Sequence, residues 1–368
     1  MGNDFTEDNG LGTRRVASAE GDRPAVGGSA STAGRVDSRT VSGPARPVHL
    51  SAGDIARPIF IDDLIDPLQE QALRAAGINC TRDSAGAVIS INRDPAQIPA
   101  TVRWVHVPFM GVDAMIGRLP ANVELLTRTV DGMPERMGQY CATAVMADRW
   151  AWSQFIHQQA KGLWRRDFRH QDPGRRAAAI LGTGYVGRAA AMALRPHFAS
   201  IWGLNRRGVD DATFDQVAAW TTIERADSAG AGSANQQRQR NDIRWKQIDT
   251  LVVTVPLTAA TENLVDWSML SQLVDAHLIL IGRGATVDFE AARQALSAHH
   301  LRHLTADVFP VEPPAPGDWV WSHPDVTMTP HICGLNSPDD AVISFERARQ
   351  QLLAGQLPTG AVELDRGY

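Results

Sequence analysis

Three side chains in the second half of the chain have the residue types needed for carboxylate binding and proton transfer. Arg283 follows the apolar run 278–281, Glu312 lies in a proline-flanked loop, and His331 follows a further short loop. A guanidinium binds a carboxylate, a histidine gives or takes a proton near neutral pH, and a neighbouring carboxylate keeps that histidine charged and oriented. Together the three could reduce a 2-keto acid. Taken singly, each has a simpler explanation: a surface cation, a solvated loop acid, or one of 11 mostly ordinary histidines.

Such a reduction needs a hydride donor, and the stretch Ala177 to Leu194 has the pattern of a dinucleotide-binding turn. Its apolar start is typical of a strand covered on both faces, and its small-residue end is typical of a helix packed closely on a sheet. Gly182 would make the tight turn, Gly184 would let the backbone approach a pyrophosphate, and Gly187 would let helix and strand close up. The helix N-terminus would offer unpaired N–H groups to the phosphates. The glycine pattern alone also occurs in ordinary turns.

The end of the next predicted strand, 200–204, indicates which dinucleotide would bind. In NAD-binding units an Asp or Glu at this point usually accepts hydrogen bonds from the adenosine ribose. Here the neutral Asn205 is followed by Arg206 and Arg207. These suit a 2′-phosphate, because guanidinium groups bind phosphate through charge-assisted hydrogen bonds. NADP(H) is therefore the preferred prediction and NAD(H) the alternative, and a solvated basic turn would explain the arginines without any cofactor.

Composition limits the class of protein. The 368 residues, 43% of them hydrophobic, are enough for two domains, and the net charge of −5 gives no sign of a nucleic-acid-binding surface. Cys80, Cys141 and Cys333 are too few and too scattered for a disulfide framework or a zinc site. No apolar run is long enough for a membrane span, and the N-terminus lacks the apolar core of a signal peptide. We therefore expect a cytoplasmic protein with no metal, nucleic-acid or membrane partner.

Two segments are predicted to lie outside the folded domains. Residues 1–55 are rich in Gly, Ser, Ala and Arg and poor in large apolar side chains, which predicts a disordered tail. Residues 226–241 are small and polar and predict a surface-loop insertion. After the tail, alternating strands and helices predict a small parallel α/β domain, with strands at 58–61, 87–91 and 102–107 and a helix at 68–76. Strands are also predicted at 249–258 and 278–284.

Two polar stretches have open interpretations. The loop 108–113 follows a predicted strand, where open α/β sheets bind ligands, although a simple turn is the alternative. His299, His300 and His303 have a spacing that invites a metal ion. No acidic or cysteine partner accompanies them, so we interpret them as exposed surface histidines.

Five motifs in one order closely resemble the signature series of the D-isomer-specific 2-hydroxyacid dehydrogenases. They are GTGYVG at 182–187, VPLTAATEN at 255–263, GRGATVD at 282–288, ADVFPVEP at 306–313 and TPHI at 329–332. The resemblance runs from about residue 56 to the end. The final VELDRGY at 362–368 and the double arginine after the second strand resemble the glyoxylate/hydroxypyruvate reductase branch most.

That resemblance implies a fold of the α/β class with two doubly wound parallel-sheet domains. A Rossmann dinucleotide-binding domain would be inserted into a flavodoxin-like substrate domain. The implied boundaries are 56–130 for the first part of the substrate domain, 131–331 for the NAD(P)-binding domain and 332–368 for a C-terminal return with a helix at 341–353. Residues 137–142 resemble the family's long linking helix. A homodimer formed through the cofactor domains is also implied.

The resemblance also implies residue roles. Arg283 would hold the substrate carboxylate, protonated His331 would donate to the carbonyl oxygen, and Glu312 would keep the imidazole charged and oriented. A loop made of Met110, Gly111 and Val112 would complete carboxylate binding. The implied cofactor-binding residues are Gly182, Thr183, Gly184, Tyr185, Val186, Gly187, Asn205, Arg206, Arg207, Thr254, Val255, Pro256 and Asp307.

The leading hypothesis is an NADPH-preferring reductase of a small 2-keto acid such as glyoxylate or hydroxypyruvate, producing the D-2-hydroxy acid. One alternative is an NAD-dependent dehydrogenase of a larger 2-hydroxy acid such as phosphoglycerate. Another is a dinucleotide-sensing binding protein without catalytic activity. The presence of Arg283, Glu312 and His331 together favours catalysis, because a sensor could lose any of them.

Overall fold

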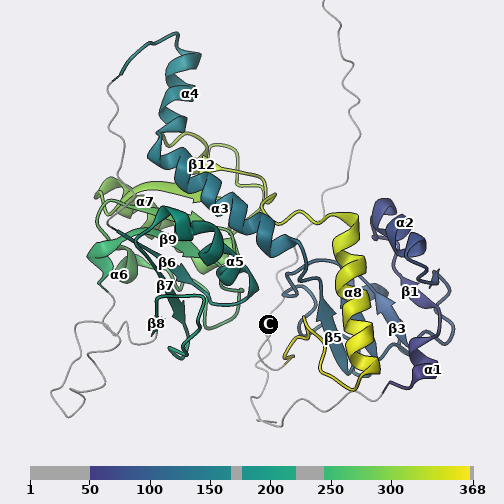
Figure 1. The fold of residues 1–368 in the computed structure, drawn as a ribbon. Helices are drawn as coiled ribbons and strands as arrows, with labels where there is room; N and C mark the ends of the chain where they lie inside the picture. The colour runs from purple at the N-terminus through teal and green to yellow at the C-terminus, as the bar shows by residue number, and fades with distance from the viewer. Residues whose placement is uncertain (1–49, 167–175, 221–243, 365–368) are drawn as a thin grey trace, which may run out of the picture. The chain divides into compact units, whose positions relative to one another are not determined.

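The computed structural model describes residues 50–166, 176–220 and 244–364 (Figure 1). The predicted insertion at 226–241 and the predicted tail up to residue 49 lie outside the described residues. The described part contains two sheets whose strands all pair in parallel. This confirms the predicted α/β class with two doubly wound parallel sheets.

The first sheet belongs mainly to the N-terminal part of the chain and has the strand order β2–β1–β3–β4–β5. One face is covered by α2 and by α8, which comes from the far end of the sequence; there Phe345 stacks on Trp104 with ring centroids 5.0 Å apart. Val112 and Met115 cover the other face. The elements are β1 (Ile59–Ile61), α2 (Pro67–Ala75), β2 (Cys80–Thr81), β3 (Ile89–Ile91), β4 (Trp104–Val107), β5 (Leu125–Arg128) and α8 (Pro338–Leu353).

The second sheet has the strand order β12–β11–β10–β9–β6–β7–β8. Its chain order reverses between β6 and β9, which is where doubly wound sheets open a crevice for ligands. The strands are β6 (Ala177–Leu181), β7 (Ser200–Asn205), β8 (Gln216–Ala219), β9 (Ile248–Val253), β10 (Ala276–Leu280), β11 (Leu301–Ala306) and β12 (Val326–Met328).

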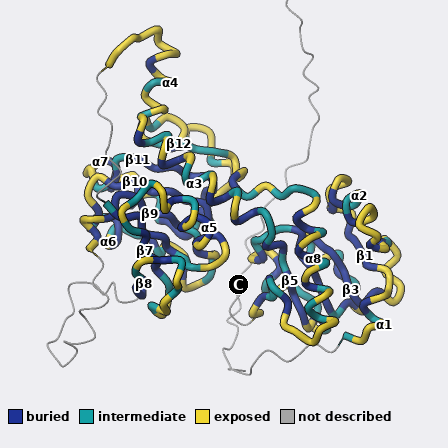
Figure 2. Tube along the Cα trace, in the orientation of Figure 1, coloured by how far each residue is buried: buried dark blue, intermediate teal, exposed yellow. Residues whose placement is uncertain are grey.

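Alternate residues of a strand point to opposite faces of the sheet. The central strands β6, β9 and β10 are buried at every residue, so both faces of the sheet are covered there (Figure 2). On one face Ile180 and Val252 pack against α3 (Met133–Arg149) and α5 (Tyr185–Leu194). On the other face Leu251 packs against α6 (Trp267–Leu270) and α7 (Phe289–Ser297). None of the helices in the described part of the chain is long and apolar enough to cross a membrane.

The structure extends and corrects the predicted elements. Helix α1 (Ala52–Ile55) lies inside the predicted tail. Its N-cap residue Ser51 accepts a hydrogen bond from the Asp54 N–H, and Ile55 is buried, so ordered structure begins before position 56. Helix α8 begins at Pro338 rather than 341, because the Ser337 N–H donates to the Asp340 carboxylate and proline favours the first helical turn. Helices α4 (Trp152–Ala160) and α6 and strands β2, β5, β8, β11 and β12 had no prediction.

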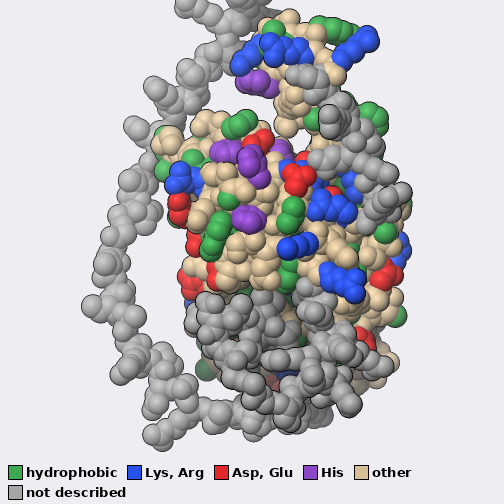
Figure 3. Space-filling view, turned by 90° about the vertical axis from the view of Figure 1, so that its left-hand side faces the viewer, with side chains coloured by type: hydrophobic (Ala, Val, Ile, Leu, Met, Phe, Trp, Pro, Cys, Tyr) green, Lys and Arg blue, Asp and Glu red, His purple; other side chains and the backbone are tan. Residues whose placement is uncertain are grey.

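The interpretation of three exposed histidines is wrong for His303. Histidine side chains do gather on one face of the molecule (Figure 3), and His299 is exposed. His303, however, is buried on β11 and hydrogen-bonds Thr327 Oγ1 at 2.9 Å, and His300 Nδ1 lies 2.9 Å from the Leu273 carbonyl. The strand begins at Leu301, so its alternation turns His303 inward. Within the described ranges no three His, Cys, Asp or Glu side chains could hold a metal ion.

Candidate active site

A pocket of about 1210 Å³ lies at the carboxyl ends of β6, β9 and β10 and also reaches the loop after β4. Of the predicted site residues, sixteen line it: Met110, Gly111, Val112, Gly182, Thr183, Gly184, Tyr185, Val186, Gly187, Asn205, Arg206, Thr254, Val255, Pro256, Arg283 and His331. Residues far apart in the sequence thus meet around one cavity, at the place where the strand order reverses.

The glycine-rich turn has the shape expected of a pyrophosphate cradle. Gly182 has φ +107°, and a Cβ there would lie 2.6 Å from Thr254 Oγ1. A Cβ at Gly187 would lie 1.8 Å from the Gly182 carbonyl oxygen, so only glycine lets α5 approach β6 this closely. A Cβ at Gly184 would meet nothing within 4 Å, and no side chain caps the ten-residue α5 there. The open space and uncapped N–H groups fit a dinucleotide pyrophosphate.

The end of β7 carries no carboxylate toward the pocket. The Asn205 side chain bonds both the turn that follows it and the glycine-rich turn. Its Oδ1 accepts from the Arg207 and Val209 N–H groups, both at 3.1 Å, and its Nδ2 donates to the Val209 carbonyl at 2.9 Å and to Thr183 Oγ1 at 3.3 Å. Arg206 lines the pocket, whereas Arg207 does not. One of the two predicted arginines is therefore brought to the site.

Arg283 is held across the pocket by a residue that sequence reasoning missed. Its Nε donates to Asp113 Oδ1 at 2.9 Å, Nη2 lies 2.8 Å from the same oxygen, and Nη1 donates to the Gly282 carbonyl at 2.9 Å. A Cβ at Gly111 would lie 1.5 Å from Nη2, so glycine leaves the room that the guanidinium fills. The loop 110–113 thus both faces Arg283 and fixes its direction.

His331 and Glu312 form a hydrogen-bonded pair. His331 Nδ1 lies 2.8 Å from Glu312 Oε2, while Glu312 Oε1 accepts from the Phe309 N–H at 2.9 Å. Because Nδ1 is engaged, Nε2 is the ring atom left for proton transfer. The His331 side chain is 49% exposed, and its backbone has φ +55°, an unusual conformation for a residue with a side chain. Glu312 does not line the pocket and acts on it only through His331.

The structure does not bring Asp307 to the pocket as a cofactor contact. Its side chain is fully buried. The carboxylate accepts from Thr329 Oγ1 at 2.5 Å and from the Ile332 and Cys333 N–H groups at 2.9 Å each. The turn after β12 therefore folds over the acid at the end of β11, and the carboxylate is used by the turn that carries His331.

Arg128 is a second pocket residue that sequence reasoning missed. It ends β5, and its Nη1 donates to the Met110 carbonyl at 3.4 Å. Its Nε is buried without a hydrogen-bond partner among the described residues. Burial lowers the pKa of Arg128, and the positive charge of Arg283 lowers it further, against an opposing effect of Tyr185. The only sequence signal was a polar residue at the carboxyl end of a short apolar run.

A glycine cradle, an arginine and a histidine–glutamate pair around one crevice of a doubly wound sheet define a nicotinamide-dependent dehydrogenase. Residues 216–333 match the model of the D-isomer specific 2-hydroxyacid dehydrogenase, NAD binding domain. The chain belongs to the D-isomer-specific 2-hydroxyacid dehydrogenase family, a family of NAD(P)-dependent oxidoreductases.

The chain is also similar to individual proteins over most of its length. The chain is 36% identical over 270 residues to the "Uncharacterized protein in mprR 3'region" of Streptomyces coelicolor, covering 73% of this chain and 90% of that protein. It is 29% identical over 266 residues to glyoxylate/hydroxypyruvate reductase A of Yersinia enterocolitica, covering 70% and 79%. The fold matches a D-isomer specific 2-hydroxyacid dehydrogenase from Xanthobacter autotrophicus Py2, solved with NADPH and MES, with TM-score 0.69, 24% identity and coverage of 84% and 99%.

Proposed function

We propose that this protein reduces a small 2-keto acid, of the glyoxylate or hydroxypyruvate type, to the 2-hydroxy acid, which is the D-isomer where the product is chiral. The observation that carries the proposal is the shared pocket: Arg283 and His331 line the same cavity as the glycine cradle. The relative named glyoxylate/hydroxypyruvate reductase A supports the substrate class.

In the proposed mechanism, Arg283 binds the substrate carboxylate. Asp113 and the Gly282 carbonyl fix the guanidinium, and the N–H groups left on Nη1 and Nη2 face the substrate. Arg128 lines the same pocket and adds a second positive charge. The substrate is thereby oriented with its carbonyl toward His331.

His331 is the proposed general acid. A reduced dinucleotide held by the glycine cradle would supply the hydride. His331 Nε2 gives its proton to the carbonyl oxygen, and Glu312 stabilises the positive charge that the imidazole carries before transfer. The neutral imidazole then regains a proton from solvent, which its exposure permits.

NADP(H) is the proposed cofactor, with NAD(H) as the alternative. Support comes from the absence of a carboxylate at the end of β7, where Asn205 stands, and from Arg206 at the pocket wall. The glycine cradle accepts either dinucleotide. Arg128 and Arg283 place two positive charges in the same pocket. This favours a second candidate substrate, a larger 2-keto acid with an additional anionic group.

Three broader features belong to the same proposal. The domain division at 56–130, 131–331 and 332–368 is supported by α8 packing with α2 on the first sheet. Cytoplasmic location is supported by Cys80, Cys141 and Cys333, which are free and buried. A homodimer is supported by apolar side chains exposed on and after α4, among them Trp152, Ile156 and Trp164.

Oxidation of NADPH and, separately, of NADH tests the activity, with glyoxylate, hydroxypyruvate, phosphohydroxypyruvate and bulkier 2-keto acids as substrates. We expect turnover of the two small acids with a preference for NADPH. The variant Arg206→Ala should lose that preference mainly through a higher KM for NADPH, because the phosphate contact is lost. Tight cofactor binding without turnover of any acid would refute the proposed catalytic activity and favour the alternative of a dinucleotide-sensing binding protein.

A further inference from the structure

We propose that Tyr140, acting through Thr329 and Asp307, is a positioning residue that sets the orientation of His331. The inference rests on the proposed function in so far as His331 is the general acid. None of the three residues lines the large pocket. Their effect would therefore pass through the backbone of the His331 turn.

The His331 turn is built around Asp307. Three consecutive N–H groups donate to this one residue: His331 to its carbonyl oxygen, Ile332 to Oδ1 and Cys333 to Oδ2, each at 2.9 Å. Between them the chain holds His331 at φ +55°. A residue with a side chain adopts this conformation only when its surroundings impose it. The hydrogen bonds from the N–H groups of Ile332 and Cys333 to the Asp307 carboxylate are such a constraint.

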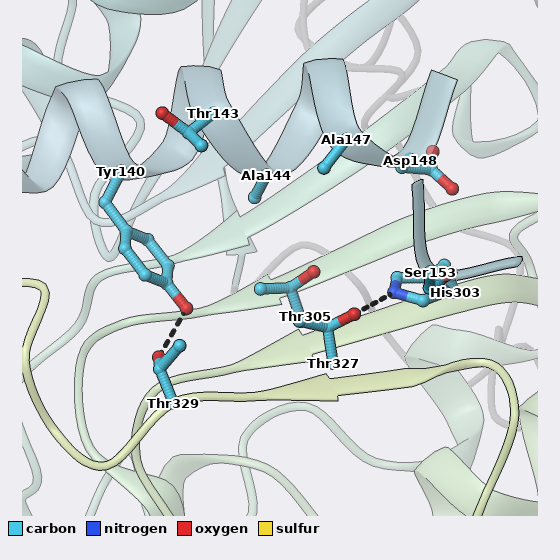
Figure 4. Close-up of a pocket in the computed structure, with 10 residues that line it drawn as sticks. All are labelled: Tyr140, Thr143, Ala144, Ala147, Asp148, Ser153, His303, Thr305, Thr327 and Thr329. Atoms are coloured by element: carbon cyan, nitrogen blue, oxygen red, sulfur yellow. Dashed lines mark hydrogen bonds between the residues drawn. The ribbon is translucent and has the colours of Figure 1, made fainter. Parts of the chain in front are cut away.

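The hydrogen bonds between the side chains run in one direction. Asp307 as a carboxylate only accepts, so Thr329 Oγ1 must donate to its Oδ1. The Thr329 hydroxyl has one hydrogen, which is now used, so its oxygen must accept from the Tyr140 hydroxyl at 2.6 Å (Figure 4). Burial raises the pKa of Tyr140, which keeps the phenol protonated and therefore a donor. Tyr140 thus fixes the Thr329 rotamer, and Thr329 fixes Asp307.

Tyr140 belongs to a stripe of α3 that contacts the chain on both sides of His331. Arg136 Nε donates to the Leu335 carbonyl at 2.9 Å, and a Cβ at Gly334 would lie 3.3 Å from both Met133 and Met137. Positions 133, 136, 137 and 140 share one helix face. Helix α3 begins five residues after β5 ends, so the helix that leaves the first sheet also holds the turn of the proton donor.

The test compares Tyr140→Phe with Thr143→Val as a matched control. Tyr140 and Thr143, one turn further along α3, both line a small cavity of about 150 Å³ (Figure 4). The Thr143 hydroxyl, however, donates to the Gln139 carbonyl of its own helix. For Tyr140→Phe we expect kcat for the 2-keto acid to fall about tenfold, with cofactor Kd unchanged, because small misplacements of an acid slow the chemical step. The primary isotope effect with deuterated cofactor should rise. Thr143→Val should change neither.

A second pair keeps the proposal falsifiable if removal of the phenol prevents folding. Thr329→Val should reproduce the loss of kcat, and Thr329→Ser, which retains the hydroxyl, should restore it. Hydrogen exchange of the Ile332 and Cys333 amides should accelerate in Tyr140→Phe and Thr329→Val but not in Thr143→Val. Exchange does not depend on turnover, so it tests the link even if the wild-type protein proves inactive and the proposed function fails. Unchanged kcat, isotope effect and amide exchange in Tyr140→Phe would overturn the proposal.

Discussion

At the scale of single residues, the site depends on side chains that reach across the pocket only because a neighbour is small. Arg283 occupies the space that a Cβ at Gly111 would fill. Asp113, two residues further, then provides the carboxylate that fixes it. The same short loop therefore supplies both the room and the counter-charge.

The variant Gly111→Ala tests this arrangement. The added Cβ would displace the guanidinium from Asp113, and we expect kcat/KM for the 2-keto acid to fall about 100-fold, as for a misplaced binding group. Cofactor affinity should be retained, because the three atoms nearest to the added Cβ belong to Arg283 and Asp113 and none of them to the glycine cradle. The control variant Gly53→Ala on α1 should leave kcat/KM unchanged, because its added Cβ would lie no closer than 3.6 Å to any neighbouring atom. An unchanged kcat/KM for Gly111→Ala would show that Arg283 can act from another position.

At the scale of elements, β4 and β5 are joined by a buried polar network around His106. Trp104 Nε1 donates to Thr127 Oγ1 at 2.8 Å, Thr127 Oγ1 lies 2.9 Å from His106 Nδ1, and Thr129 Oγ1 lies 3.3 Å from Nε2. The Thr129 hydroxyl donates its one hydrogen to the Val107 carbonyl at 3.2 Å, so its oxygen accepts from His106 Nε2–H. In the neutral ring Nδ1 is then the acceptor, and the Thr127 hydroxyl donates to it. Burial lowers the pKa of His106 to about 3.

This network predicts a loss of stability in mild acid. The unfolded chain binds a proton at His106 below about pH 6.5 whereas the folded chain does not, so stability is full above that pH and declines toward pH 3. At pH 5 the loss from this residue is about 2 kcal/mol of unfolding free energy. Denaturant unfolding of His106→Gln between pH 7.5 and 5 should show that much less pH dependence. The control His157→Gln, at an exposed position on α4, should behave like the wild type.

Strand length did not decide which strands the sequence predicted: the three-residue β1 and β3 lie in longer apolar runs and were predicted, whereas the six-residue β11, which carries Arg302, His303 and Thr305, was not. The strands that flank the glycine turn are five or six residues long and fully or mostly apolar, so their pattern is unambiguous. Strands β5 and β12 have only three or four residues, two of them polar threonines in contact with buried partners, and only the tertiary structure reveals them. Missing β5 also meant missing Arg128 at its end.

The same limit applies to the site. Arg283, Glu312 and His331 could be found from their types and motif order, and the structure brings His331 and Glu312 within 2.8 Å. Asp113 is 170 positions from Arg283, and no local pattern connects the two. Asp307 was identified as important but given a cofactor role, because its contacts with the turn at 329–333 depend on how β11 and β12 lie together.

At the scale of the whole molecule, the apolar surface on and after α4 favours self-association. Trp152 is 59% exposed, Ile156 60% and Trp164 88%. We expect a sedimentation mass of two chains, and we expect Ile156→Glu to shift it toward one chain because a charge would be buried in the interface. The control Leu357→Glu, at a residue that follows α8 and is 72% exposed, should leave the mass unchanged. A wild-type sedimentation mass of one chain in dilute solution would refute the proposed homodimer.

The proposed chemistry of the molecule as a whole depends most on the proton donor. His331→Asn is the sharpest variant, because asparagine tolerates the left-handed backbone at φ +55° and leaves the turn intact. The decisive measurement is the rate of NADPH oxidation with glyoxylate and with hydroxypyruvate, alongside NADPH affinity, for the wild type and this variant. We predict that kcat falls by about 10³-fold while NADPH affinity stays the same. A variant that reduces either acid at the wild-type rate would contradict the role of His331 as the general acid.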